Sequence, residues 1–373
     1  MKSRHFVALS LLATAFACTA PEKSETAAET AAEPEKAPVI ETLKAPTAAA
    51  DIKWEEWAAV GAADAELDWP AGVAKTRGTL FLVGTRALKR TAGPGPRAEI
   101  VFMKVTPGGL DEVAAYPSHF GERAGAAVTA GPNGRLWFVG GMYTPPPIKL
   151  APEGQLDYAE LSTPVGEVYA WDPATKEFQL ETFLPVPRGD AAAFFADGEL
   201  YVVGGRYDQA EPADDNNRQV HRYNPRDGLW TKLHNLRVPL ARVAAAAARG
   251  GLYVIGGTQL KPAHVTNAVR RYDLVVYKWQ TLPQLPHPRA GATAFVVGDY
   301  IYLVGGCEAE ALGSPPRMAL KSYRYDLNKK IWEELPSPLP EGCSLVAFDG
   351  SYFYLVAAHK TYRGRIVRAE AES

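Results

Sequence analysis

The chain has 373 residues and a formal net charge of −2, which gives no general reason to expect binding to nucleic acid or to an anionic membrane surface. Charged residues make up 22% and aromatic residues 10% of the chain, as in ordinary globular proteins. The 33 glycines and 30 prolines predict many turns.

Residues 1–17 have the pattern of a signal peptide. Lys2 and Arg4 precede the apolar run FVALSLLATAFA, which is too short to span a bilayer. The run ends in Ala15-Phe16-Ala17-Cys18, which fits either ordinary signal-peptidase cleavage or lipidation of Cys18, as in a bacterial lipoprotein. We therefore predict export to a bacterial cell envelope, in a lipid-anchored or periplasmic form, with secretion as the alternative.

The next segment, residues 18–50, is built almost entirely from Ala, Glu, Pro, Thr and Lys, and contains no aromatic residue. Such a composition buries too little apolar surface to offset the entropy of ordering the chain. We expect a disordered linker here, which would suit a tether between a lipidated Cys18 and the folded domain. The alternative is a linker without a role.

From residue 51 onward the chain repeats a short strand pattern. The stretches LYVIGG, LYVVGG, IYLVGG, RLWFVGG, TLFLVGT and YFYLVAA recur at intervals of 49 to 64 residues, a spacing typical of repeat architectures. Downstream of four of them stand two aromatic residues seven positions apart, the first followed by Asp or Asn, which favours a turn. These pairs are Trp171/Phe178, Tyr223/Trp230, Tyr272/Trp279 and Tyr325/Trp332.

Together, the double glycines, the spaced aromatics and the period resemble the kelch repeat. The resemblance implies that each repeat is one four-stranded blade of a β-propeller. It extends over about residues 51–369, with weaker signals in the first and last repeats. There GT and AA replace the double glycine, and Met103 and Leu110 stand at the aromatic positions of the first repeat.

The innermost strand of each blade should be made of small residues, because blades crowd together near a propeller axis. Six stretches fit, among them AAAAA at 244–248, where packing overrides the helix propensity of alanine. The sixth repeat lacks a fourth strand, and DIKWEEWAAV near residue 51 resembles the outer strand KKIWEELPS. We therefore predict an all-β fold over 51–373, a six-bladed kelch-type β-propeller closed by an N-terminal strand.

The loops at one end of a kelch propeller, its mouth, are the usual binding surface, so candidate binding residues are sought there. An arginine precedes the inner strand in four consecutive blades, at Arg123, Arg188, Arg242 and Arg289, and the equivalents in the last and first blades are Glu341 and Asp68. With Tyr143 and Arg206 from neighbouring loops, the arginines would form an anion-binding mouth, since converging guanidinium groups suit carboxylates and phosphates. The alternative is that they brace blade junctions by bonding nearby carbonyls.

Other residue types give weaker signals. The histidines of this end, including His264 and His287, match no metal-ligand spacing, so we predict no metal and no other cofactor. Once Cys18 is set aside, Cys307 and Cys343 form an even pair in an exported chain and are a disulfide candidate. The alternative is two small buried side chains.

We expect a monomeric, non-enzymatic binding module of the cell envelope whose mouth binds a protein, a peptide or a carbohydrate. Kelch adaptor domains of ubiquitin ligases bind acidic peptides through mouth arginines, and the resemblance implies the same class of ligand here. The alternative is a sugar-active enzyme similar to the kelch-type sialic-acid mutarotases, which are also exported and six-bladed. Such an enzyme requires an arginine close to a carboxylate in a deep mouth.

Overall fold

The computed structural model describes residues 47–59, 67–87, 98–106, 109–117, 123–143, 163–207, 215–341, 345–356 and 360–368. Within these ranges the chain forms β-strands and two short 3-10 helices, η3 (Pro132–Gly134) and η5 (Asp215–Arg218), and no α-helix. The all-β prediction is therefore confirmed for this part of the chain.

Six antiparallel sheets of four strands account for most of the structure. The first contains β2 (Leu67–Thr76), β3 (Thr79–Ala87), β4 (Ala98–Thr106) and β5 (Gly109–Pro117). The second contains β7 (Ala127–Ala130), β8 (Leu136–Val139), β11 (Glu167–Asp172) and β12 (Glu177–Phe183). The third contains β13 (Ala192–Ala196), β14 (Glu199–Val203), β15 (Val220–Asn224) and β16 (Leu229–Lys232).

The remaining three follow the same order from the inner to the outer strand. The fourth sheet contains β18 (Ala244–Ala248), β19 (Gly251–Ile255), β22 (Val269–Asp273) and β23 (Lys278–Leu282). The fifth contains β25 (Thr293–Val297), β26 (Tyr300–Val304), β29 (Tyr323–Asp326) and β30 (Ile331–Glu334). The sixth contains β31 (Leu345–Phe348), β32 (Phe353–Val356), β33 (Lys360–Arg368) and β1 (Ala50–Ala59).

Three small sheets lie where the chain approaches the inner strands of the second, fourth and fifth sheets. They are β6 (Arg123–Ala124) with β9 (Met142–Tyr143) and β10 (Thr163–Pro164), β17 (Leu240–Ala241) with β20 (Thr258–Leu260) and β21 (Ala263–Val265), and β24 (Arg289–Ala290) with β27 (Cys307–Glu308) and β28 (Arg317–Met318). They fix the positions of the residues just before the inner strands.

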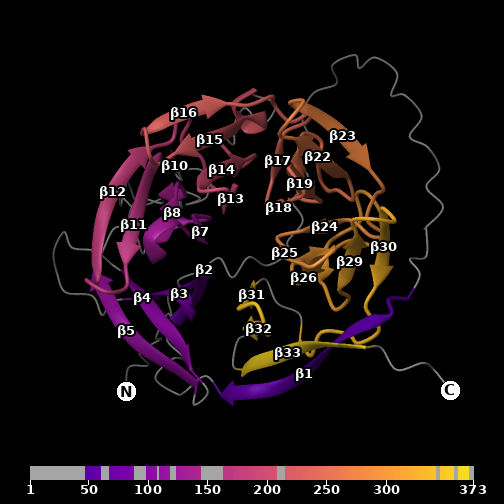
Figure 1. Ribbon diagram of the computed structural model, residues 1–373, viewed down its shortest axis with the longest axis horizontal. Helices are drawn as coiled ribbons and strands as arrows, with labels where there is room; N and C mark the ends of the chain where they lie inside the picture. The colour runs from indigo at the N-terminus through magenta and orange to yellow at the C-terminus, as the bar shows by residue number, and fades with distance from the viewer. Residues whose placement is uncertain are drawn as a thin grey trace, which may run out of the picture.

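The six larger sheets are arranged in a ring around a central axis (Figure 1). Neighbouring inner strands contact one another in the order β2, β7, β13, β18, β25, β31 and back to β2. The ring is joined by β1, which pairs along its length with β33, from Ala50 opposite Arg368 to Ala59 opposite Lys360. An N-terminal strand thus completes the sheet of the C-terminal strand, as the sequence predicts.

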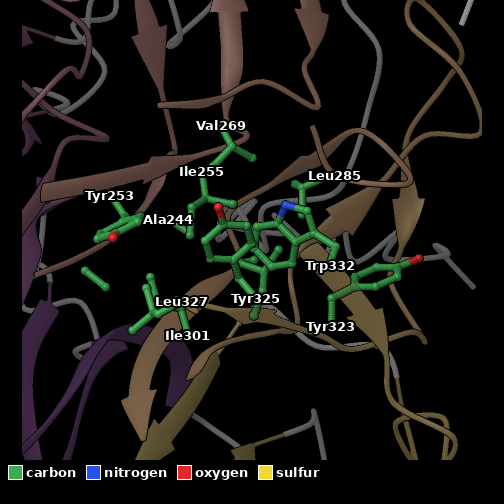
Figure 2. Close-up of a cluster of buried hydrophobic side chains, with 13 residues drawn as sticks. Ala244, Tyr253, Ile255, Val269, Leu285, Ile301, Tyr323, Tyr325, Leu327 and Trp332 are labelled. Carbon is green, nitrogen blue, oxygen red and sulfur yellow. The ribbon is translucent and has the colours of Figure 1, made fainter. Parts of the chain in front are cut away.

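The hydrophobic cores lie between neighbouring sheets. Figure 2 shows the core between the fourth and fifth sheets, where Tyr253, Ile255 and Val269 of the fourth sheet pack against Ile301, Tyr325 and Trp332 of the fifth. Five further cores fill the other junctions, including the one between the sixth and first sheets. Because every sheet buries both faces, the ring is held by apolar burial between sheets.

The aromatic pairs seven residues apart lie directly opposite each other on the two outer strands. In the fifth sheet Tyr325 faces Trp332, with ring centroids 5.1 Å apart, and the Trp332 indole N–H donates to the Pro283 carbonyl at 3.0 Å. The indole N–H of Trp279 likewise donates to the His234 carbonyl. The pair therefore fixes the outer hairpin and attaches it to the preceding sheet.

The alanine run 244–248 is the inner strand β18, as predicted. Ala244 and Ala246 pack in the core toward the fifth sheet, and Ala247 packs toward the third. Larger side chains at these positions would separate the neighbouring sheets, since protein cores are close-packed.

The predicted linker ends earlier than residue 50. Ala48 is buried, its N–H donates to the Glu334 carbonyl at 2.8 Å, and Ala50 already belongs to β1. The predicted signal peptide, Cys18 and the linker up to residue 46 lie outside the described residues. Among the described residues, no helix is long and apolar enough to cross a membrane.

Candidate functional site

The residues before the inner strands are aligned by backbone pairing, and this corrects the predicted arc of four arginines. Arg123, Leu240 and Arg289 pair with Tyr143, Gln259 and Glu308, each the second residue after a double glycine. The second glycine of each double glycine donates its N–H to the carbonyl of the equivalent residue in the next sheet. Gly141 donates to Arg188, Gly205 to Leu240 and Gly257 to Arg289. Arg242 is therefore two residues out of register, and its equivalents are Gly125, Asp190 and Gly291.

Arg188 is a buried brace between sheets, with a side chain that is 1% exposed. It donates to the carbonyls of Gly204 and Gln219 at 3.1 and 2.9 Å, and its Nη2 lies 3.2 Å from Nδ1 of His221. Burial lowers the pKa of Arg188 to about 10, and burial together with Arg188 lowers the pKa of His221 to about 3. His221 is therefore neutral and can accept from the guanidinium.

Arg289 has the same role one junction further along, and is also 1% exposed. It donates to the carbonyls of Gly305 and Lys321 at 3.0 and 2.9 Å and to Glu308 Oε2 at 2.7 Å. Burial lowers its pKa, and Glu308 and Tyr323 oppose that effect. The carbonyl-bracing alternative thus describes Arg188 and Arg289.

Arg123 occupies the equivalent position in the second sheet and is also largely covered. Its guanidinium lies 3.2 Å from Glu167 and over the Tyr169 ring, and the side chain is 11% exposed. Three of the four predicted arginines therefore contact their own framework.

The positions that do line up with Arg242 form a backbone-bonded series around the axis. The N–H of Asp190 donates to the Gly125 carbonyl, that of Arg242 to Asp190, and that of Gly291 to Arg242, each at 2.8 Å. All four residues have φ between 53° and 66°. Glycine adopts this conformation freely, whereas other residues lose about 1 kcal/mol or more. Asp190 and Arg242 are therefore strained choices, which marks this end of the ring as a candidate site.

A cluster of three charged side chains, Asp190, Arg206 and Arg242, occupies this end, which we call the mouth. Arg206 forms an ion pair with Asp190, and their side chains are 32% and 4% exposed. Burial lowers the pKa of Arg242, Asp190 raises it and Arg206 lowers it further, so both of these groups lie close enough to influence Arg242. A Cβ at Gly125 would lie 2.6 Å from Asp190 Oδ1, and one at Gly291 would lie 3.0 Å from Arg242 Nη2. The two glycines thus leave room for the charged side chains.

The other predicted mouth residues contact residues of the second and sixth sheets. Tyr143 pairs with Arg123 and Thr163 in the second sheet's small extension. Glu341 accepts a hydrogen bond from the Tyr362 hydroxyl at 2.8 Å. Cys307 is disulfide-bonded, and Cys343, its predicted partner, lies outside the described residues. No group of three or more metal-ligating side chains occurs among the described residues.

Sequence reasoning missed Asp190 and His221. Asp190 stands where two other repeats have glycine in an Arg-Ala-Gly-Ala pattern, and this departure was the available signal. His221 lies in the strand pattern of the third repeat and carries no signal of its contact with Arg188.

Comparison with known proteins gives a consistent result for the repeat region. Residues 165–359, just over half of the chain, match the family model described as the KLHDC2/KLHL20/DRC7 Kelch-repeats domain. Kelch-like protein terF of Aspergillus terreus is 28% identical over 196 residues, which cover 50% of this chain and 41% of that protein. Human Kelch-like protein 23 is 31% identical over 204 residues, which cover 53% of this chain and 34% of that protein.

The matched segments therefore span less than half of the length of these two relatives. Among solved structures, that of YjhT superposes with a TM-score of 0.57 at 16% identity, covering 82% of this chain and 96% of that one. At this identity the likeness concerns the fold alone.

Proposed function

Because this chain belongs to the kelch-repeat domain family, whose propellers generally serve as protein-binding modules, we propose that it is a six-bladed binding module of the cell envelope that is not an enzyme. Its mouth would bind a protein, a peptide or a carbohydrate. The six four-stranded sheets and the β1–β33 pairing support the blade count.

The observation that carries the proposal is the cluster of Asp190, Arg206 and Arg242. Arg206 pairs with Asp190 and Arg242 lies near enough for its pKa to be influenced by both, so these three side chains together carry one net positive charge. Arg206 is 32% exposed and within reach of a ligand, unlike Arg188 and Arg289. A ligand with a carboxylate, such as an acidic peptide or an acidic sugar, suits this arrangement.

Binding to peptide and glycan arrays tests this proposal. The protein should bind acidic members, and the double variant Arg206→Gln/Arg242→Gln should lose that binding while its melting curve shows that it is still folded at the assay temperature. Arg317→Gln is a matched control, because Arg317 is 67% exposed and lies outside the cluster. Acidic ligands that bind the double variant as well as the unchanged protein would contradict the proposal.

A second candidate is the sugar-active enzyme, and the Arg206–Asp190 contact favours it. A carboxylate can act as the general base, and the arginine beside it can bind the carboxylate of an acidic sugar. Polarimetry or NMR of anomer exchange in acidic sugars separates the two functions. A rate above the uncatalysed one that disappears in Asp190→Asn would replace the binding proposal with the enzyme.

We further propose that Cys18 carries a lipid anchor and that the folded part is monomeric. Labelled palmitate should enter the protein, and Cys18→Ser should release it from membranes. A membrane-free protein with an unmodified Cys18 would contradict the anchor.

A further inference from the structure

A hollow of about 490 Å³ lies at the opposite end of the inner strands from the mouth. Its walls come from the last residues of β13, from Ala245–Ala248 of β18, from the middle of β25 and from Phe348 of β31. It also reaches the inner hairpin turns at Asp197 and at Arg249-Gly250. The volume falls in the range of small-molecule sites.

Aromatic and small apolar side chains dominate the wall. Four phenylalanines, one or two from each of three sheets, line it together with Ala245, Ala247 and Val296; the phenylalanines are Phe194, Phe195, Phe295 and Phe348. All four rings are half-buried, and Val296 is 39% exposed. The inner strands that carry these phenylalanines, β13, β25 and β31, each pair with one neighbouring strand only, so the other edge of each borders the axis.

The charges around the hollow leave one carboxylate in excess. Arg249 pairs with Asp299 and also donates to Asn328 Oδ1 at 2.9 Å, so its charge is compensated. Asp197, exposed on the adjacent inner turn, has no cationic partner among the described residues. This excess is opposite in sign to that of the mouth.

We propose that the hollow binds an organic cation with an apolar body, of the alkyl- or arylammonium class. The phenylalanine rings would contact the apolar body and attract the cation, and Asp197 would supply the counter-charge. This site is separate from the mouth and does not depend on the function proposed for it.

Three benzyl compounds of similar size test the proposal by calorimetry or ligand-observed NMR: benzyltrimethylammonium, benzyl alcohol and phenylmethanesulfonate. The cation should bind most tightly and the sulfonate most weakly. Asp197→Asn should weaken binding of the cation roughly threefold to tenfold and leave benzyl alcohol unchanged. The fold should tolerate this change, because the equivalent inner turn of the second sheet is Asn133-Gly134.

Val296→Trp should fill the hollow and abolish binding of the cation. Val276→Trp is the matched control, since Val276 is 55% exposed but does not line the hollow. Arg206→Gln/Arg242→Gln at the mouth should leave binding of the cation intact. Equal affinity for the three probes, or cation binding that survives Val296→Trp in a protein of unchanged melting temperature, would overturn the proposal.

Discussion

Individual arginines show where the sequence is informative and where it is not. Their positions near the start of the blades could be predicted from the repeat, but their roles depend on how deeply each side chain is buried. Arg188 bonds three backbone carbonyls and Arg289 bonds two, each in a buried junction. Arg242 lies two residues out of register because Leu240 takes the equivalent place. No spacing in one sequence distinguishes a buried guanidinium from an exposed one.

The buried pair of Arg289 and Glu308 gives the first prediction. Arg289→Ala should lower the free energy of unfolding by about 3–5 kcal/mol, because it leaves a buried carboxylate and two carbonyls without their donor. Arg317→Ala, which removes an exposed ion pair with Glu310, should change it by at most ~1 kcal/mol. Urea unfolding measures both. Similar small losses in the two variants would show that Arg289 is no brace.

His221 gives a pH-dependent prediction. The unfolded chain takes up a proton at a histidine below about pH 6.5, whereas burial and Arg188 lower the folded pKa of His221 to about 3. The free energy of unfolding should therefore decrease as the pH is lowered from about 6.5 towards 3, by about 1.4 kcal/mol per pH unit. The stabilisation due to neutral His221 is fully present above about pH 6.5.

Urea unfolding between pH 5 and pH 7.5 measures this slope. In His221→Gln, whose side chain can still accept from Arg188, the part of the slope due to this histidine should disappear. An unchanged slope would mean that His221 is protonated in the folded protein.

At the scale of elements, the outer hairpins could be predicted well, because a Tyr/Trp pair seven residues apart places the two rings opposite each other across a four-residue turn. The last turn residue takes a positive φ at Lys176, Gly228, Tyr277 and Lys330. In the fourth sheet, Val275 of this turn is 77% exposed. Strand composition does not reveal such a turn, since valine and tyrosine are more typical of strands.

The equivalent positions Tyr277 and Gly228 give a reciprocal prediction. Tyr277→Gly should stabilise the protein by about 1 kcal/mol, because φ is 55° there and the N–H bond to the Asp273 carbonyl is kept. Gly228→Tyr should destabilise it by a similar amount, since φ is 71° and nothing obstructs a Cβ.

Melting temperatures and urea midpoints measure the two changes. A loss of stability in Tyr277→Gly would show that the tyrosine ring contributes more than its backbone conformation costs.

At the scale of the whole molecule, the repeat and its strand order could be read from the sequence because each sheet reuses one pattern of burial. The charges at the two ends of the ring could not be read from the sequence. The mouth cluster joins residues of three separate segments, and the hollow on the other side depends on which inner turns carry Asp197, Arg249 and Asp299. Such juxtapositions arise from the packing of neighbouring sheets, and the spacing of residues within one repeat does not reveal them.

The disulfide is a prediction about the same closure. Cys307 is disulfide-bonded, and we expect Cys343 to be its partner. A closed loop of about 36 residues would stabilise the protein by roughly 3.5–4 kcal/mol in the chain-entropy model. Thiol titration of the unfolded, unreduced Cys18→Ser variant should find no free thiol. Two free thiols would exclude the bridge to Cys343, and reduction of the protein should lower its melting temperature.

The pairing of β1 with β33 also sets the order in which the protein can be completed. Among the described strands β1 is synthesised first and its partner β33 last, so Ile52 has no pairing partner until Ile366 has been made. Until then β1 is an unpaired edge, the kind of strand that pairs with other chains. Lys53, Glu55 and Glu56 place charges along it, which guard such edges against aggregation. The sixth sheet, and with it the finished ring, therefore forms only after β33 has been made.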